Sequence, residues 1–127
     1  MIPRVLLLLL VVGGAHAETP QQILDSLVAE AGPASAARGE KLYRSKFAGG
    51  RNADSCAACH TENAKAVGRH VKTNKAIDPL APVAQLDRFT DPAKVEKWFK
   101  RNCNDVLGRA CSAQEKADFT AYMISLK

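Results

Sequence analysis

The sequence predicts a single all-helical domain of about five helices behind a short export leader. Apolar residues recur at helical spacing in several segments, and capping residues stand directly before those segments. No segment alternates apolar and polar residues as a β-strand does. The chain has 127 residues, which is enough for one domain with one core once the leader is removed.

Residues 1–17 have the three parts of a cleavable signal peptide. Arg4 supplies a positive charge, an apolar run follows over Val5–Val12, and Ala15 and Ala17 form an Ala-x-Ala cleavage site. The apolar run is far shorter than the ~20 residues that cross a bilayer. We therefore expect cleavage after Ala17 and export, with an uncleaved anchor as the alternative.

Residues 18–127 are expected to form one domain with a modest basic charge. The whole chain has 18 Lys and Arg against 13 Asp and Glu, and 6% of its residues are aromatic. Binding to nucleic acid would require a denser basic surface with aromatic platforms, whereas the aromatics here fall at core spacings. We therefore exclude nucleic acid as a partner.

The first helix is expected over residues 20–31. Thr19 and Gln22 form a capping box, and Pro20 occupies the first helical position, where proline is favoured. Gly32, followed by a proline, ends the helix.

A second helix is expected over residues 35–48, because Gly39, Tyr43 and Phe47 lie four apart on one face. A glycine on that face lets another helix approach closely, and Tyr122 is the natural partner. Residues 51–89 contain few regular patterns, and so long a loop in a small domain must wrap around something.

Asp91 and Pro92 predict the start of the next helix. Its apolar face comprises Val95, Trp98 and Phe99, and helical spacing adds Asn102, so we expect Asn102 to point inward with the aromatics.

The last helix is expected to open with a capping box made by Ser112 and Glu115. Its inward face is predicted to carry Phe119, Tyr122, Met123 and Leu126.

Cys56-Ala-Ala-Cys59-His60 is the attachment pattern of haem c. The two thiols add across the haem vinyl groups, and the adjacent histidine binds the iron. Zinc knuckles and thioredoxin-like sites also use Cys-x-x-Cys pairs. A zinc site would need two more ligands, such as Cys103 and Cys111, and a thioredoxin-like site would need a preceding strand. The histidine and the leader favour one covalent haem on each chain.

Three residues could bind the iron opposite His60. Met123 is the only methionine after the leader, but its place late in the last helix favours a core role. His70 lies in a basic loop, where a surface role is more common. A buried Asn102 amide without a partner would cost free energy, so its side chain should have one. The iron and a hydrogen-bonding group inside the protein are about equally good candidates for that partner.

Cys103 and Cys111 are expected to form a disulfide, because the exported chain folds in an oxidising compartment. The bond would hold the neighbouring Asn102 in place. A structural staple is favoured over a redox-active disulfide beside the haem.

Several motifs resemble the sphaeroides haem protein (SHP) family of class I cytochromes c. Besides the haem pattern, they are Pro79-Leu-Ala-Pro82, Arg88-Phe-Thr-Asp91, Val95-Glu-Lys-Trp98, Arg101-Asn-Cys-Asn104 and Gly108-Arg-Ala-Cys111. The resemblance covers nearly all of residues 18–127, and the Arg-Asn-Cys-Asn segment is its most specific part.

The resemblance implies a class I cytochrome c fold in which about five helices wrap around one covalently attached haem. It implies that His60 and the side chain of Asn102 bind the ferric iron, and that Cys103 and Cys111 form a disulfide beside the haem. On reduction, Asn102 would leave and the iron would bind oxygen, nitric oxide or a similar small ligand. The carbonyl of Pro79 is expected to accept the imidazole N–H, as a proline carbonyl does in similar cytochromes.

The alternative function is a conventional low-spin electron carrier with Met123 or His70 as sixth ligand. An enzyme that reduces oxygen and a simple electron carrier both stay open. The expected location is the periplasm, and the expected redox partner is another exported or membrane cytochrome. Lys94, Lys97 and Arg101 form a basic stripe that could dock an acidic partner.

Overall fold

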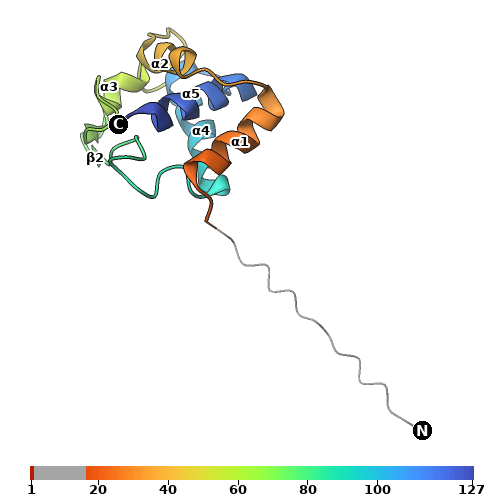
Figure 1. Ribbon diagram of the computed structural model, residues 1–127. Coiled ribbons are helices and arrows are strands. Elements are labelled where there is room, and N and C mark those ends of the chain that lie inside the picture. The colour runs from red at the N-terminus through yellow and green to blue at the C-terminus, as the bar shows by residue number, and fades with distance from the viewer. Residues whose placement is uncertain (2–16) are drawn as a thin grey trace.

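The computed structural model describes Met1 and residues 17–127, so the expected signal peptide lies almost wholly outside the described residues. Five α-helices and two short strands are present there (Figure 1). They are α1 Pro20–Ala31, α2 Ala36–Arg44, α3 Cys56–His60, β1 Gly68–Arg69, β2 Ala76–Ile77, α4 Pro92–Leu107 and α5 Ala113–Ser125. The predicted helical fold class is confirmed.

The helix starts follow the predicted caps. Thr19 and Ser112 each form a complete capping box, with Gln22 and Glu115 respectively as the reciprocal partners. Asp91 accepts two backbone N–H groups at the start of α4. Each cap satisfies backbone donors that the helix cannot pair internally, which explains why the starts could be read from the sequence.

Helix α5 lies in the middle of the helical layer, and both α1 and α2 pack against it (Figure 1). Gly39 of α2 sits at the tightest point of the crossing. A Cβ atom at this position would lie 2.8 Å from the Cβ of Tyr122 and would collide with the backbone carbonyl of Asp118. The predicted close approach of Gly39 and Tyr122 is confirmed.

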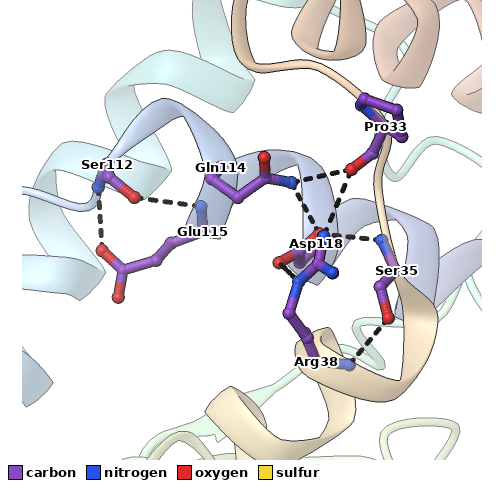
Figure 2. A network of polar contacts seen from close by, with 7 residues as sticks. All are labelled: Pro33, Ser35, Arg38, Ser112, Gln114, Glu115 and Asp118. Carbon is purple, nitrogen blue, oxygen red and sulfur yellow. Dashed lines mark hydrogen bonds and ion pairs between the residues drawn. The ribbon is translucent and has the colours of Figure 1, made fainter.

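A polar network beside this crossing joins the start of α2 to α5 (Figure 2). The carboxylate of Asp118, only 4% exposed, accepts hydrogen bonds from the Ser35 backbone N–H at 2.8 Å and from Arg38 Nε at 2.8 Å. Gln114 Nε2 donates to the same carboxylate at 2.9 Å, and both Arg38 and Gln114 also donate to the Pro33 carbonyl. The network fixes the direction in which the chain enters α2.

The second helix is shorter than predicted, because it ends at Arg44 rather than before residue 49. Both the backbone N–H and the hydroxyl of Ser45 donate to the Lys41 carbonyl and close the last turn. The backbone N–H of Phe47 then pairs with the Asp54 carbonyl at 2.7 Å. Phe47 therefore belongs to a loop and not to the helical face assigned to it.

The strands were not predicted. β1 and β2 form an antiparallel hairpin in which Gly68 pairs with Ile77 and Arg69 with Ala76. Each strand has two residues, which is too short for an alternating pattern to be visible in the sequence.

The core consists of two clusters. One cluster consists of buried residues of α1, α4 and α5, namely Ile23, Leu27, Val95, Phe99, Cys103 and Ala117. The other contains Tyr43, Ala64, Tyr122 and Met123, with Cys56 and Ala57 of α3 packed against it. Phe89 and Phe119 contact both clusters and join them. No helix in residues 17–127 has the length and hydrophobicity that crossing a bilayer requires.

Candidate haem site

Helix α3 places the haem-attachment pattern on a single helical turn. Ser55 caps the helix, and its hydroxyl accepts the backbone N–H of Ala58 at 3.1 Å. Cys56 and Cys59 are half-buried free thiols one turn apart, and His60 is the last helical residue. Residues three apart in a helix share a face, so both sulfur atoms lie on one side of α3.

The end of α3 is held by contacts from two other segments. Thr61 has a φ of 67°, which turns the chain sharply away from the helix, and its carbonyl accepts the Tyr43 hydroxyl at 2.6 Å. Gly68 of β1 passes so close that a Cβ there would collide with the Cys59 carbonyl and lie 3.0 Å from the Cα of His60. α2 and the hairpin together fix the position of the His60 backbone.

Burial determines the protonation states of two side chains of α3, His60 and Cys56. The pKa of His60 is lowered to about 4, first by burial and then by the positive charge of Arg88. The imidazole is therefore neutral near pH 7 and can offer a lone pair to a metal. Burial also raises the pKa of Cys56 to about 11, so this thiol stays protonated.

The structure argues against the two other interpretations of the cysteine pair, a thioredoxin-like dithiol and a zinc site. A thioredoxin-like site would need a strand before the cysteine pair, and α1 and α2 are the only elements before α3 in residues 17–127. A four-cysteine zinc site would need Cys103 and Cys111, which are bonded to each other. Among the described residues, no group of three or more His, Cys, Asp and Glu side chains is arranged to hold a metal ion.

Asn102 does not face the core as predicted. The buried face of α4 comprises Val95, Phe99, Cys103 and Val106. Asn102 lies on the adjacent face, one turn after Trp98, and both side chains are exposed, Trp98 to 44%. Helical spacing placed Trp98 and Asn102 on the face of Val95 and Phe99, whereas they lie on the face beside it. The Asn102 amide makes no hydrogen bond within the described chain.

The disulfide between Cys103 and Cys111 is confirmed. Its Cα atoms are 5.6 Å apart, and it links α4 to the segment before α5. Because Cys103 is buried in the core next to Asn102, the bond restrains the part of α4 that carries Asn102.

Comparison with known proteins places this arrangement in a family. Residues 29–123 match a family described as a domain of unknown function, DUF1924. The cytochrome c-type protein SHP of Cereibacter sphaeroides is 47% identical over 107 residues, which cover 83% of this chain and 82% of that protein. The chain belongs to the SHP family of c-type cytochromes.

Solved structures agree with this membership. The structure of oxidized SHP, described as an oxygen binding cytochrome c, superimposes with a TM-score of 0.81 at 45% identity and covers 86% of this chain and 98% of that one. A solution structure of cytochrome c'' from Methylophilus methylotrophus, described with insights into haem-ligand detachment, gives a TM-score of 0.71 at 36% identity, with 84% and 93% coverage. The predicted class I cytochrome c fold is confirmed.

Membership in the SHP family implies a covalently bound haem c, and the residues of α3 fit this group. Two free thiols one turn apart and a neutral imidazole directly after them are the donor set that haem c requires. Several apolar side chains that follow α3 in the sequence are also exposed, among them those of Leu86, at 84%, and Trp98. Such surface suits contact with a flat apolar ring better than contact with water.

The other two candidate iron ligands lie elsewhere. Met123 has 0% exposure and belongs to the core cluster of Tyr43 and Tyr122, as the core interpretation predicted. The Nδ1 atom of His70 accepts the backbone N–H groups of Lys72 and Thr73 and so caps its own hairpin turn.

The sequence assigned no role to Arg88, whose positive charge contributes to the lowered pKa of His60. Arg88 Nε donates to the Pro79 carbonyl at 2.8 Å, and a terminal nitrogen donates to the Asp78 carbonyl at 2.9 Å. The expected bond from His60 to that proline carbonyl is not among the hydrogen bonds of residues 17–127. Nothing in the spacing links residues 79 and 88, and only the presence of Arg88 in a family motif could have pointed to it.

Proposed function

We propose that this chain is an exported monohaem cytochrome c that accepts an electron and then releases Asn102, so that oxygen, nitric oxide or a similar small ligand can bind. When bound, haem c would supply an iron that changes between the ferric and ferrous states. Cys56 and Cys59 would hold the group covalently, and His60 would offer its imidazole nitrogen to the iron. The sequence contains one such motif, which corresponds to one haem per chain.

The observation that carries the proposal is the state of Asn102. Its side chain is exposed and makes no hydrogen bond within the described residues, so its amide oxygen is available as a ligand. An amide oxygen is a hard, neutral donor that suits ferric iron better than ferrous iron. Reduction therefore weakens the interaction.

The disulfide at Cys103 supports a reversible release. It restrains the backbone of α4 directly beside Asn102, so the side chain can leave and return without a shift of the helix. The relatives support the same behaviour, since SHP is described as an oxygen binding cytochrome c and cytochrome c'' as a case of haem-ligand detachment. The rival electron carrier would need Met123 to leave a fully buried position, at the cost of its packing.

The experiment compares the holoprotein with Asn102→Ala and with Asn104→Ala as the matched control. Asn104 is on the same helix, but its amide donates to the Lys100 carbonyl at 2.7 Å. We expect native ferrous protein to bind carbon monoxide, and only Asn102→Ala to change the ferric spectrum. An unchanged ferric spectrum in Asn102→Ala, or a methionine-to-iron charge-transfer band in the native protein, would remove Asn102 as the ligand.

The electron is proposed to come from an acidic exported or membrane cytochrome in the periplasm, where cleavage of residues 1–17 would release the chain. The docking surface is the cationic face of α4, formed by the exposed residues Lys94, Lys97, Lys100 and Arg101. None of the four is part of an ion pair found in residues 17–127, whereas Glu96 is neutralised by Lys116 at 2.8 Å.

Two further features suit this face to an acidic partner. Arg101 lies 5.6 Å from the centre of the Trp98 ring, and this cation–π contact holds its charge on the α4 face. A cavity of about 450 Å³ between α4 and the start of α5 is lined in part by Lys97 and Lys100, and the ion pair of Glu96 with Lys116 also lines it. Reduction by an acidic cytochrome should slow with rising salt, and Lys97→Gln should be slower at low salt and less sensitive to salt than Lys75→Gln on the hairpin. Salt-independent rates would contradict this docking surface.

A further inference from the structure

The last turn of α2 holds the residue that directly follows His60. Helix α2 packs against α3 as well as against α5 (Figure 1), and the Tyr43 hydroxyl donates a hydrogen bond to the Thr61 carbonyl at 2.6 Å. The direction of this hydroxyl is fixed by packing, because Tyr43 is 0% exposed and the centre of its ring lies 5.7 Å from that of Tyr122 on α5. The α2–α5 crossing therefore reaches the end of α3 through one phenol group.

Thr61 has a backbone conformation that its surroundings must enforce. Its φ of 67° and ψ of 173° lie in a region that is essentially reserved for glycine, and Thr61 is β-branched. Its own side chain provides part of the restraint, since Oγ1 donates to the Asn63 carbonyl at 3.0 Å and accepts the Asn63 backbone N–H at 3.1 Å. The Tyr43 hydroxyl adds a restraint from another element. Without these bonds the turn would relax toward a more common conformation.

His60 is restrained differently on its two sides. Cys59 directly precedes it, and under the proposed function the thioether bonds of Cys56 and Cys59 attach this side to the haem. Thr61 follows it and has no covalent bond to the haem. A shift of the His60 backbone away from the iron therefore passes through the turn at Thr61, and the hydrogen bond from Tyr43 opposes that shift.

We propose that Tyr43 is a positioning residue whose hydroxyl keeps His60 on the iron while a small ligand binds the opposite axial position. This inference rests on the proposed function, because it requires a haem bound through His60 and an opposite position that can open. Nitric oxide weakens the bond between ferrous haem and the ligand opposite to it, so the protein itself must resist the loss of the imidazole. The Tyr43 hydroxyl provides this resistance by holding the turn after His60 in place.

The test uses the holoprotein with Tyr43→Phe and with Tyr122→Phe as the matched control. Tyr122 is a buried tyrosine of the same helix crossing, but its hydroxyl takes part in no hydrogen bond within residues 17–127. Nitric oxide is added to the reduced protein, and electron paramagnetic resonance over a range of temperatures gives the ratio of iron without the imidazole nitrogen to iron with it. The loss of one hydrogen bond should raise this ratio about fivefold in Tyr43→Phe. Tyr122→Phe should keep the native ratio.

The variants separate positioning from stability. A merely structural role would lower the stability of Tyr43→Phe to urea without changing the ratio, and that result would overturn the proposal. An equal rise in both variants would overturn it as well.

Thr61→Ala keeps the test decisive if Tyr43→Phe does not fold. Thr61 is exposed, and the substitution removes both side-chain bonds to Asn63 from the same turn. We expect the ratio to rise in this variant too. A native ratio in Thr61→Ala would show that the turn does not hold His60, and it would overturn the proposal.

The mass and spectra of the purified chain test the proposed function independently. A chain without covalently attached haem, or one whose His60→Ala variant keeps the native spectrum, would refute the proposed function itself and the role of Tyr43 with it. Reduced protein that takes up no nitric oxide would do the same. A chain with haem, His60 ligation and nitric oxide uptake but an unchanged ratio in Tyr43→Phe would refute only the role of Tyr43.

Discussion

Replacing Asp118 by asparagine tests whether the polar network of Figure 2 holds α2 against α5. The substitution keeps the shape of the side chain and one carbonyl oxygen, which can still accept from Ser35 and Gln114. It removes the negative charge and turns an amide NH₂ toward the Arg38 Nε atom that Asp118 now binds at 2.8 Å.

The expected loss of unfolding free energy follows from these contacts. Hydrogen bonds to a charged acceptor contribute about 1 kcal/mol more than neutral ones, and two such bonds are weakened. The Arg38 side chain is 57% exposed, so solvent screens its ion pair and the pair adds little to the loss. We expect a total loss of about 2 kcal/mol, or roughly 10 °C in the unfolding midpoint.

The loss should depend on pH in a defined direction. Burial alone would raise the pKa of Asp118, but the hydrogen bonds from Arg38, Ser35 and Gln114 outweigh it and hold the pKa below 3.8. A carboxyl with a lowered folded pKa stabilises the fold above its ordinary pKa, and this contribution is lost as the pH falls through the folded value. The difference between native protein and Asp118→Asn should therefore be constant from about pH 7 to about pH 5 and shrink below pH 3.8.

The assay is urea unfolding of the holoprotein followed by far-ultraviolet circular dichroism at several pH values. Asp25→Asn is the matched control, because Asp25 is an exposed carboxylate that accepts one bond from Gln21 at 2.9 Å. The control should change stability by less than ~0.5 kcal/mol. Equal effects of the two substitutions, or an Asp118→Asn effect that grows in acid, would refute the reasoning.

Three further variants test other parts of the structure. Replacing both Cys103 and Cys111 by alanine should cost about 2.5 kcal/mol of unfolding free energy by the chain-entropy estimate for a separation of 8 residues, and urea titration without reductant would measure it. Gly39→Ala should destabilise by roughly 1–3 kcal/mol in the same assay, because the new methyl group meets the Asp118 carbonyl, and a neutral result would contradict the close crossing. Met123→Leu should cost less than ~1.5 kcal/mol and leave the ferric spectrum unchanged, since a core methionine can be replaced by a side chain of similar volume.

The helix starts and the α2–α5 crossing could be predicted because local chemistry determines them. Thr19 and Ser112 satisfy backbone donors within three residues, so the signal is contained in a short stretch of sequence. Gly39 signalled a close approach because a helix rarely retains glycine without a packing reason.

Features that depend on distant contacts could not be read in the same way. The end of α2 is set by the pairing of Phe47 with Asp54, and the hairpin is too short to show a pattern. The sequence placed Trp98 and Asn102 on the face of Val95 and Phe99, whereas both lie beside that face. Which face of α4 packs inward is decided by α1 and α5, and the sequence of α4 alone is compatible with both faces.

In the candidate site too, the residues that are adjacent in sequence could be predicted, whereas those placed by distant contacts could not. The α3 residues Cys56, Cys59 and His60 are adjacent in sequence, so their shared helical turn was visible from their spacing. Arg88 reaches Pro79 across nine residues of irregular chain, and no periodicity connects them. Asn102 was singled out by its motif, and its iron ligation stays a prediction.

The most direct test of the account is the coordination of the iron in the reduced protein, measured by magnetic circular dichroism of the purified ferrous form. The account predicts a high-spin, five-coordinate centre that retains His60, has lost Asn102 and becomes low-spin when carbon monoxide is added. A ferrous centre that stays low-spin with two axial ligands and takes up no gas would contradict it.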